Sequence, residues 1–357
     1  MTVARSEVPV PVGLGILGFA HGHVGLYCRE WRGAVDSPVR LIAGWDHDRD
    51  RLKASCDGFG LEAEASVESL LARGEIAAVV IAAETSMHAD LVEAAAAAGK
   101  TIILQKPLAL TMEEADRVVA AVDRHGVRFT LAWQMRVDPE NLEIKRLIAA
   151  GVVGRVLMMR RRHGLKTHRM KGFEESWHVR PELNRGIWAD DASHAIDFLY
   201  WLFGSPRTVM AEIDTLLNPR VPDDHGIAVF RYDDGLMAEV VSSFTCVAGE
   251  NTTEVIGETG VIIQNFGDQP SAGAPKPPGA IALKWFTEAE NRWQIAGFEP
   301  PESQGVRIAG LAGPLAEFAV GRRPPIATAR EGRDVLRMTL ACHRSAESGR
   351  RVLIEES

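Results

Sequence analysis

The sequence predicts an α/β protein in two parts: a parallel sheet flanked by helices, then an α/β region built on a mainly antiparallel sheet. In the first third of the chain, short apolar runs alternate with helical patterns, as in βαβ units. After a helix expected at 139–150, Gly151 and Gly154 interrupt this pattern, and strand-like runs with polar alternation follow. The length of 357 residues exceeds one typical core and suits two domains.

The expected strands are apolar runs bounded by turn residues. In the first part they are 12–17, 39–45, 78–82, 101–104 and 128–133, with helices between them. In the second part they are 155–162, 207–216, 226–232, 237–245, 253–256 and 261–265, with hairpin links such as Asp233-Asp234-Gly235. One long helix, 187–201, comes early among these strands, and the Pro-, Gly- and Ser-rich stretch 269–279 is expected to be a surface loop.

The composition is that of an ordinary globular protein, with 46% hydrophobic and 25% charged residues. A net charge of −8 argues against nucleic acid as a partner, and the basic cluster 160–163 is interpreted as a strand exit whose side chains alternate between faces. The four cysteines are scattered without metal-ligand spacing, which predicts a reduced, cytoplasmic protein. The chain starts without a secretory leader and has no apolar run of membrane-spanning length, so we expect no membrane partner.

The stretch 13–23 turns a strand into a helix around small residues. Such a turn lets backbone N–H groups approach a pyrophosphate at a helix N-terminus, which makes Gly18, Phe19, Ala20 and His23 candidate cofactor residues. From Gly18 the pattern reads G-x-A-x-x-H, so the usual second glycine is alanine and the third is histidine. The alternative is a tight turn without a ligand.

Two histidines in this turn, His21 and His23, flank Gly22 in the manner of a metal pair. Because no third ligand stands at a suitable spacing, we expect no metal. His23 is expected to pack at the first helix turn or to line the cofactor phosphate.

Asp46 ends the next strand, about where a dinucleotide-binding fold places an acid for the adenosine ribose hydroxyls. A carboxylate there repels a 2′-phosphate and favours NAD over NADP, although His47 and Arg49 nearby soften the discrimination. Strand, glycine turn, helix and acid occur in the expected order. We therefore predict a dinucleotide cofactor, NAD or NADP.

Lys106 and Pro107 follow the apolar strand 101–104. Pro107 ends the strand because it removes a hydrogen-bond donor. An ammonium group is thereby fixed at the carboxyl end of the strand, the edge where open α/β sheets bind ligands. Lys106 is a candidate for chemistry, and the alternative is an ordinary solvated loop lysine.

Asp190, His194 and Asp197 stand at positions i, i+4 and i+7 of the expected helix and form one polar stripe. Such a stripe is costly to bury unless its groups are used or paired. A carboxylate one turn from His194 holds its tautomer or raises its pKa, which suits a general acid/base. The alternative is an acidic helix cap, Asp190 or Asp191, beside a structural histidine.

Together these features resemble the Gfo/Idh/MocA family, whose eponymous members are glucose-fructose oxidoreductase and inositol dehydrogenase. The similarity spans nearly the whole chain. The motifs that carry it are the nucleotide turn, Thr85-Ser86-Met87-His88, Gly99-Lys100, Gln105-Lys106-Pro107, Gly186 with Asp190, His194 and Asp197, and the closing Pro325-Ile326-Ala327-Thr328, Glu331-Gly332 and 341–349.

The resemblance implies a Rossmann domain, placed at 1–135, and a substrate-binding and oligomerisation α/β domain, placed at 136–357. The second domain is expected to carry a large, open, mainly antiparallel sheet through which chains form a dimer or tetramer. A closing helix at about 331–348 is expected to pack back on the first domain. Members of the family oxidise a sugar or cyclitol carbinol, or reduce the ketone, with NAD or NADP.

Carried onto this sequence, the resemblance assigns catalysis to Lys106, Asp190 and His194. Lys106 orients and polarises the reacting oxygen, His194 takes or gives the hydroxyl proton, and Asp190 supports His194 or binds a neighbouring hydroxyl. Arg136, after the fifth strand, is expected to contact substrate or cofactor. The implied cofactor site comprises Gly18, Phe19, Ala20, His23, Asp46, Thr85, His88, Gln105 and Lys106.

Two places depart from the family pattern. Gln105 replaces the usual glutamate, which removes a negative charge near Lys106 and alters its protonation or the ribose contact. Glu84 and Thr85 stand where a Pro-Asn pair is common, so the loop on the nicotinamide side is expected to differ.

The loop 166–185 carries groups suited to a polyol, which is bound by directional hydrogen bonds and a stacking face. The alternative is a solvated lid or interface loop. The groups are His168, Glu174, Glu175, Trp177, His178 and Arg180. The predicted substrate contacts are Arg136, Trp177, His178, Asp190 and His194.

The sequence therefore predicts an NAD(P)-dependent oxidoreductase that acts on a secondary alcohol or ketone of a sugar, sugar derivative or cyclitol. Two alternatives stay open, an NAD-dependent glycosidase with transient redox chemistry and a non-catalytic regulator that senses a dinucleotide. Retention of Lys106, Asp190 and His194 argues against the regulator, because a sensor needs no acid/base set.

Overall fold

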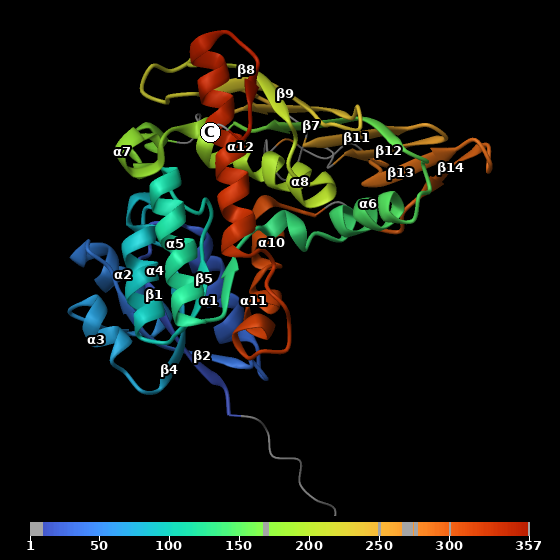
Figure 1. The fold of residues 1–357 in the computed structure, drawn as a ribbon. Helices are drawn as coiled ribbons and strands as arrows, with labels where there is room; N and C mark the ends of the chain where they lie inside the picture. Colours follow the sequence, from blue (N-terminus) through green and yellow to red (C-terminus); the bar gives the residue numbers. More distant parts are fainter. Residues whose placement is uncertain are drawn as a thin grey trace, which may run out of the picture.

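The computed structural model describes residues 10–166, 171–248, 251–265, 274, 278–299 and 301–355. Figure 1 shows a first sheet surrounded by helices and a second, longer sheet that extends away from it. His168 of the predicted substrate loop, and all of the predicted loop 269–279 except 274, 278 and 279, lie outside the described residues.

The first sheet is parallel and has, among the described residues, six strands. Their order is β3 (Glu62–Ala63), β2 (Val39–Trp45), β1 (Val12–Leu17), β4 (Ile76–Ile81), β5 (Thr101–Leu104) and β6 (Phe129–Leu131). Because β1 pairs with both β2 and β4, the chain changes direction of travel across the sheet at β1. Open α/β sheets bind ligands at such a switch point, outside the carboxyl ends of the strands.

Three of the five described helices of the first region are capped by a side chain at their N-terminus. Asp48 accepts from the backbone N–H groups of Asp50 and Arg51 at the start of α2, and Thr111 and Glu114 form a reciprocal capping box at the start of α5. These caps set where each strand-to-helix connection ends. The helices are α1 (His23–Gly33), α2 (Arg49–Phe59), α3 (Val67–Leu71), α4 (His88–Ala97) and α5 (Met112–His125).

The second sheet is mixed and has nine strands in the described part of the chain. Their order is β14 (Arg292–Ile295), β13 (Leu283–Thr287), β12 (Gly260–Asn265), β11 (Thr252–Gly257), β7 (Val156–Gly164), β10 (Met237–Ser243), β9 (His225–Arg231), β8 (Thr208–Asp214) and β15 (Val352–Leu353). All neighbours are antiparallel except β7 and β10. Buried and more exposed residues alternate along β9 and β10, as expected for a sheet with one covered face and one open face.

The other described segments between β4 and β8 are helices and single helical turns. They are η1 (Thr85–Met87), η2 (Gln134–Arg136), α6 (Pro139–Ala149), η4 (Phe173–Glu175), η5 (Trp177–Val179), α7 (Pro181–Asn184), the π-helical turn η6 (Trp188–Ala192) and α8 (Ser193–Phe203). α8 packs on the covered face of the second sheet, against β7 and β10.

The last helices return to the first sheet. α10 (Gln304–Ala309) and α11 (Ala312–Ala319) pack against α1, and α12 (Ala329–Ser348) contacts α5 near its start and β8 farther along (Figure 1). Arg330 of α12 forms an ion pair with Asp123 of α5. One helix therefore joins both sheets.

The predicted α/β fold, with a parallel and a mainly antiparallel sheet, is confirmed. Strands 12–17, 39–45 and 101–104 lie where predicted, and the other predicted strands begin and end within two residues of the expected positions. The strands β3, β13, β14 and β15 were not predicted. The helix predicted at 187–201 is instead the π-helical turn η6 followed by α8.

Within the described residues, no helix has both the length and the apolar character needed to cross a membrane.

Candidate active site

A cavity of about 260 Å³ lies where the turns after β1 and β5 face the second sheet. It combines residues from distant parts of the chain, which is typical of a ligand site at a switch point. Its ionisable lining residues are His21, His23, Lys106, His163, His178, Asp190, Asp191 and His194.

Lys106 and Asp190 form a buried ion pair in this cavity. The Lys106 Nζ lies 2.5 Å from Asp190 Oδ1 and 3.2 Å from the Asp190 carbonyl oxygen, and the two residues are 4% and 6% exposed. The second carboxylate oxygen of Asp190, Oδ2, lies 2.9 Å from Nδ1 of His178. Lys106 is thus not a solvated loop lysine, and Asp190 links it to His178.

The π-helical turn η6 carries two consecutive carboxylates, Asp190 and Asp191, and both line the cavity. π-helical turns are rare and occur frequently at functional sites. Asp191 is held by the Ser242 hydroxyl, which donates to its Oδ2 at 2.7 Å, and His163 lies 3.5 Å away.

His194 follows η6 at the start of α8 and is 5% exposed. Its ring meets Trp133 edge to face at 5.2 Å, and its Nδ1 is buried without a hydrogen-bond partner among the described residues. An orphaned buried polar group in a native structure indicates a missing ligand or water.

Burial and charge set the protonation of the two acid/base candidates. Burial alone would raise the pKa of Asp190, but the Lys106 ammonium and His178 hold it well below its usual range. Burial, and then the Lys106 ammonium, lower the pKa of His194 well below its usual value. The cavity therefore holds an ionised Asp190 beside a neutral His194 that can accept a proton.

The glycine turn after β1 has the shape of a dinucleotide cradle. Gly18 has φ of 85°, and a Cβ there would lie 2.5 Å from the Ala83 backbone, so only glycine fits. No side chain caps the N-terminus of α1. Both ring nitrogens of His21, and Nδ1 of His23, are buried without a partner in the described part of the chain. These open donors fit a pyrophosphate at a helix N-terminus.

Asp46, predicted to bind the ribose, is instead fully engaged by the protein. Its carboxylate accepts from the Phe19 N–H at 2.7 Å and from Arg51 Nε and Nη2, both at 2.8 Å. Arg51 also bonds Glu84 at 2.9 Å. Arg49, the expected neighbouring cation, donates away from this network to the Ala65 carbonyl.

Three other predicted cofactor residues are bonded inside the protein and do not line the cavity. Thr85 Oγ1 donates to Asn184 Oδ1 at 2.9 Å, and His88 Nδ1 lies 2.9 Å from the Pro107 carbonyl oxygen. Gln105 is fully buried, and its Nε2 donates to the Tyr27 hydroxyl at 3.0 Å. In this structure these side chains position the loops after β4 and β5.

Arg136, predicted to contact substrate or cofactor, and Asp197 of the polar stripe pair with each other in this structure. Arg136 Nη2 lies 2.7 Å from Asp197 Oδ1, and Arg136 Nη1 lies 2.6 Å from Glu331 Oε1. Arg136 and Asp197 are 4% and 0% exposed and lie outside the cavity lining. A buried guanidinium needs carboxylate partners, and Arg136 of η2 finds them on two helices. It thereby joins η2 to α8 through Asp197 and to α12 through Glu331.

Trp177 and His178 are adjacent in sequence but take different positions. His178 lines the cavity, whereas Trp177 stacks on the His178 ring at 4.0 Å and donates its indole N–H to the Ala20 carbonyl at 3.1 Å. Trp177 therefore contacts the glycine turn and holds His178 against it.

Sequence reasoning missed Asp191, His163 and His21 as cavity residues. Asp191 was considered only as a helix cap, although a regular helix already places it three residues before His194 on a neighbouring part of the same face. His163 belongs to the basic cluster 160–163, which was interpreted only as a strand exit, and the structure places it among the buried residues of β7. No local signal shows which inward residues of a strand meet a distant cavity.

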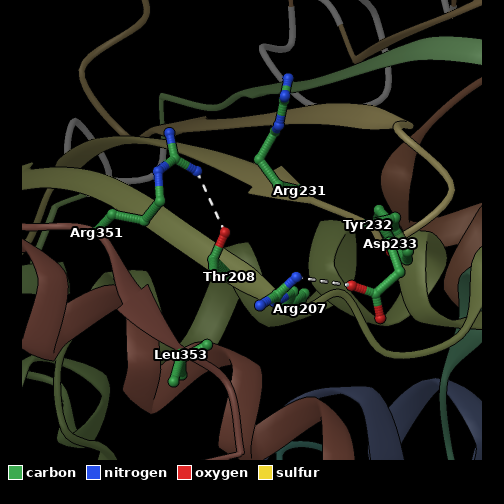
Figure 2. Close-up of a pocket in the computed structure, with 7 residues that line it drawn as sticks. All are labelled: Arg207, Thr208, Arg231, Tyr232, Asp233, Arg351 and Leu353. Carbon is green, nitrogen blue, oxygen red and sulfur yellow. Dashed lines mark hydrogen bonds and ion pairs between the residues drawn. The ribbon is translucent and has the colours of Figure 1, made fainter.

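A second hollow, of about 680 Å³, lies at the β15 edge of the second sheet. Figure 2 shows three arginines around it, Arg207, Arg231 and Arg351, of which Arg207 pairs with Asp233 at 3.5 Å. Charged side chains at a sheet edge discourage pairing with another strand. Its distance from the carboxyl ends of the first sheet makes it no candidate for the chemistry of the cavity.

Family models describe both halves of the chain. Residues 10–132 match the model of an oxidoreductase family with an NAD-binding Rossmann fold, and residues 141–263 match the GFO/IDH/MocA C-terminal domain. The chain belongs to the Gfo/Idh/MocA oxidoreductase family. It is accordingly an oxidoreductase with an NAD-binding Rossmann fold, which confirms the predicted enzyme class and cofactor.

Individual relatives of this Gfo/Idh/MocA protein agree with the family models. The myo-inositol dehydrogenase Hyg17 of Streptomyces leeuwenhoekii is 30% identical, covering 80% of this chain and 83% of its own. Inositol 2-dehydrogenase 3 of Saccharopolyspora erythraea is 28% identical, covering 70% and 71%. An Agrobacterium radiobacter oxidoreductase solved with NAD+, L-tartaric acid and magnesium has the same fold, with a TM-score of 0.82 at 19% identity over 97% and 99% of the chains.

Proposed function

We propose that this protein is an NAD-dependent dehydrogenase that oxidises a secondary alcohol of a neutral sugar, sugar derivative or cyclitol, or reduces the corresponding ketone. The observation that most supports it is the convergence of Lys106, Asp190 and His194 in one cavity beside the glycine turn. The inositol dehydrogenases among its relatives support the same substrate class. Bound NAD supplies an acceptor for the hydride of the carbinol carbon.

The proposed roles follow from the hydrogen-bonding capacity of each group. An ammonium has three donors, and the carbonyl and carboxylate of Asp190 take two of those on Lys106, which leaves one for the reacting oxygen. His194 is the proposed acceptor of the hydroxyl proton, because its Nδ1 has no hydrogen-bond partner among the described residues. Asp190 acts through Lys106, because its carboxylate fixes the ammonium in place.

The charges of the cavity support a neutral substrate. Asp190 pairs with Lys106 and with His178, and Asp191 adds a further carboxylate to the lining. Burial lowers the pKa of His21, His23, His163 and His194, so these rings add no positive charge near neutral pH. A carboxylate or phosphate on the substrate would be repelled, whereas hydroxyl groups suit the carboxylate and imidazole acceptors.

The test is a panel of inositols, sugars, sugar acids and glycosides incubated with NAD, with NADH absorbance as the readout. We expect NADH formation with at least one neutral polyol and little with its acid derivative. Glycoside cleavage without net NADH would favour the glycosidase. No turnover at all, combined with NAD-dependent binding to a partner protein, would favour the regulator.

We further propose that 1–135 and 136–357 act as cofactor and substrate domains, and that chains associate through the open face of the second sheet. Trp293 and Ile295 are 47% and 60% exposed there, and Ile227 and Met237 are 43% and 39% exposed. Apolar side chains gathered on one face indicate an interaction surface. Light scattering should show an oligomer, and Ile295→Glu should weaken it.

A cytoplasmic location is proposed from the four unpaired thiols.

A further inference from the structure

Three side chains form a polar bridge across the crevice at β1. Asp46 follows β2 and Glu84 follows β4, the two strands on either side of β1. Arg51 of α2 joins them, because its Nη2 lies 2.8 Å from Asp46 Oδ1 and 2.9 Å from Glu84 Oε1. The side chains of Asp46, Glu84 and Arg51 are 0%, 5% and 25% exposed. The bridge lies at the adenosine end of a Rossmann crevice, where the acid after β2 is found, so Glu84 faces that end and not the nicotinamide side expected from the sequence.

The acceptor capacity of Asp46 is already used. Its Oδ1 accepts from the Asp48 N–H and from Arg51 Nη2, both at 2.8 Å, and its Oδ2 accepts from the Phe19 N–H at 2.7 Å and from Arg51 Nε at 2.8 Å. A carboxylate offers about four acceptor sites, so Asp46 has none left for a ribose hydroxyl. Its task is to hold the glycine turn and Arg51.

Arg51 is the cation of this bridge, and arginine is the residue type that binds phosphate in a bidentate way. Alone with Asp46 it would form a neutral pair that could turn toward a 2′-phosphate. Glu84 prevents this in two ways: it binds the same guanidinium nitrogen, and it adds a second carboxylate. His47 lies 3.0 Å from the other oxygen of Glu84 and holds it in position.

We infer that Glu84 is the residue that sets the preference of this protein for NAD over NADP, by retaining Arg51 in a bridge with two carboxylates. Glu84 is a positioning residue, because it acts through Arg51. The inference rests on the proposed use of NAD and is independent of which polyol is oxidised. Glu84 stands where related sequences commonly have a Pro-Asn pair, and the inference gives this departure a role in cofactor selection.

The test measures equilibrium binding of NAD+ and NADP+ to the full-length protein by calorimetry, without substrate. In Glu84→Gln, the NADP+ dissociation constant should fall about tenfold, the scale of one removed like-charge contact, while that for NAD+ stays within about threefold. The double variant Glu84→Gln with Arg51→Gln should lose the NADP+ gain. Glu62→Gln is the matched control, because Glu62 pairs with Arg73 at 2.7 Å on the surface.

Unchanged NADP+ affinity in Glu84→Gln, or an equal weakening of both cofactors, would overturn the inference. Glu84→Ala removes the same carboxylate and serves as the second variant if the glutamine variant fails to fold. A merely structural role for Glu84 would not tighten NADP+. The binding measurement contains no polyol, so a failed dehydrogenase assay would not affect the inference about Glu84. Conversely, an unchanged cofactor preference in Glu84→Gln would not affect the proposed dehydrogenase activity.

Discussion

The Lys106 ammonium and the Asp190 carboxylate form one buried ion pair, 2.5 Å between Nζ and Oδ1, that joins the end of β5 to the π-helical turn η6. The pair connects the parallel sheet to the helix that covers the second sheet. Because Asp190 also contacts His178, its removal affects both neighbours.

Asp190→Asn should lower turnover by about 10²- to 10³-fold, within the range that positioned acid/base groups contribute. The amide no longer compensates the Lys106 charge, so the ammonium is left buried without its partner. NAD+ affinity should change little. Steady-state kinetics and calorimetry on the same preparation check this, and a turnover within about twofold of the parent would contradict the role given to Asp190.

Asp191→Asn should raise the KM for the polyol about tenfold or more, since a hydrogen bond to a charged group contributes about 1.5–3 kcal/mol. Asp191 lines the cavity beside His194 and is held by Ser242. The kcat should fall less than the KM rises. Ser242→Ala is the milder companion variant. An unchanged KM would show that Asp191 does not contact the substrate.

Arg136→Met should lower the free energy of unfolding by about 3–5 kcal/mol, because it leaves the buried Asp197 carboxylate without its partner. The KM for both substrates should stay within about twofold, as expected for a residue outside the cavity. Urea unfolding and kinetics together decide between the two roles. A stable variant with a raised KM would restore the substrate contact that the sequence predicted.

Acid should destabilise the protein from about pH 6.5 downward, the ordinary histidine pKa. Burial is the main cause that lowers the pKa of His23 to about 3, and of His88 and His343 to about 4. The unfolded chain then binds more protons than the folded one, so stability falls as pH falls, by up to about 1.4 kcal/mol per pH unit for each histidine. The loss of stability continues as the pH falls toward the lowered pKa values of these histidines in the folded protein.

Urea unfolding at several pH values between 7.5 and 5 checks this expectation, with pH limits chosen around the ordinary histidine pKa of about 6.5. His343→Gln, distant from the cavity lining, should reduce the slope by about one proton. An unfolding free energy that does not change over this range would contradict it.

Much of the fold was predictable because local patterns determine it. The strand Thr101–Leu104 is a short apolar run closed by Lys106-Pro107, and its position needs no tertiary information. The strands β13 and β14 were missed because they form a hairpin whose partially exposed aromatic residues follow a Pro- and Gly-rich stretch. Lys106, Asp190 and His194 were predicted as site residues, and the structure brings them to one cavity.

The parts of the site that escaped prediction depend on contacts between distant segments. Arg136 is drawn into the interior by Asp197 and Glu331, which come from two later helices. Asp46 is occupied by Arg51, a residue that periodicity places only on a helix. Asp191 lines the cavity through its contact with Ser242, a residue of β10 whose position beside η6 depends on the tertiary fold.

The central claim is that Lys106 and His194 perform the proton and oxygen chemistry of a polyol dehydrogenase. The most direct measurement compares turnover and NAD+ affinity of Lys106→Ala and His194→Ala with the parent, using the best polyol from the panel. We expect turnover to fall by about 10²-fold or more in each variant while NAD+ binding survives. Near-normal turnover in both variants would contradict it.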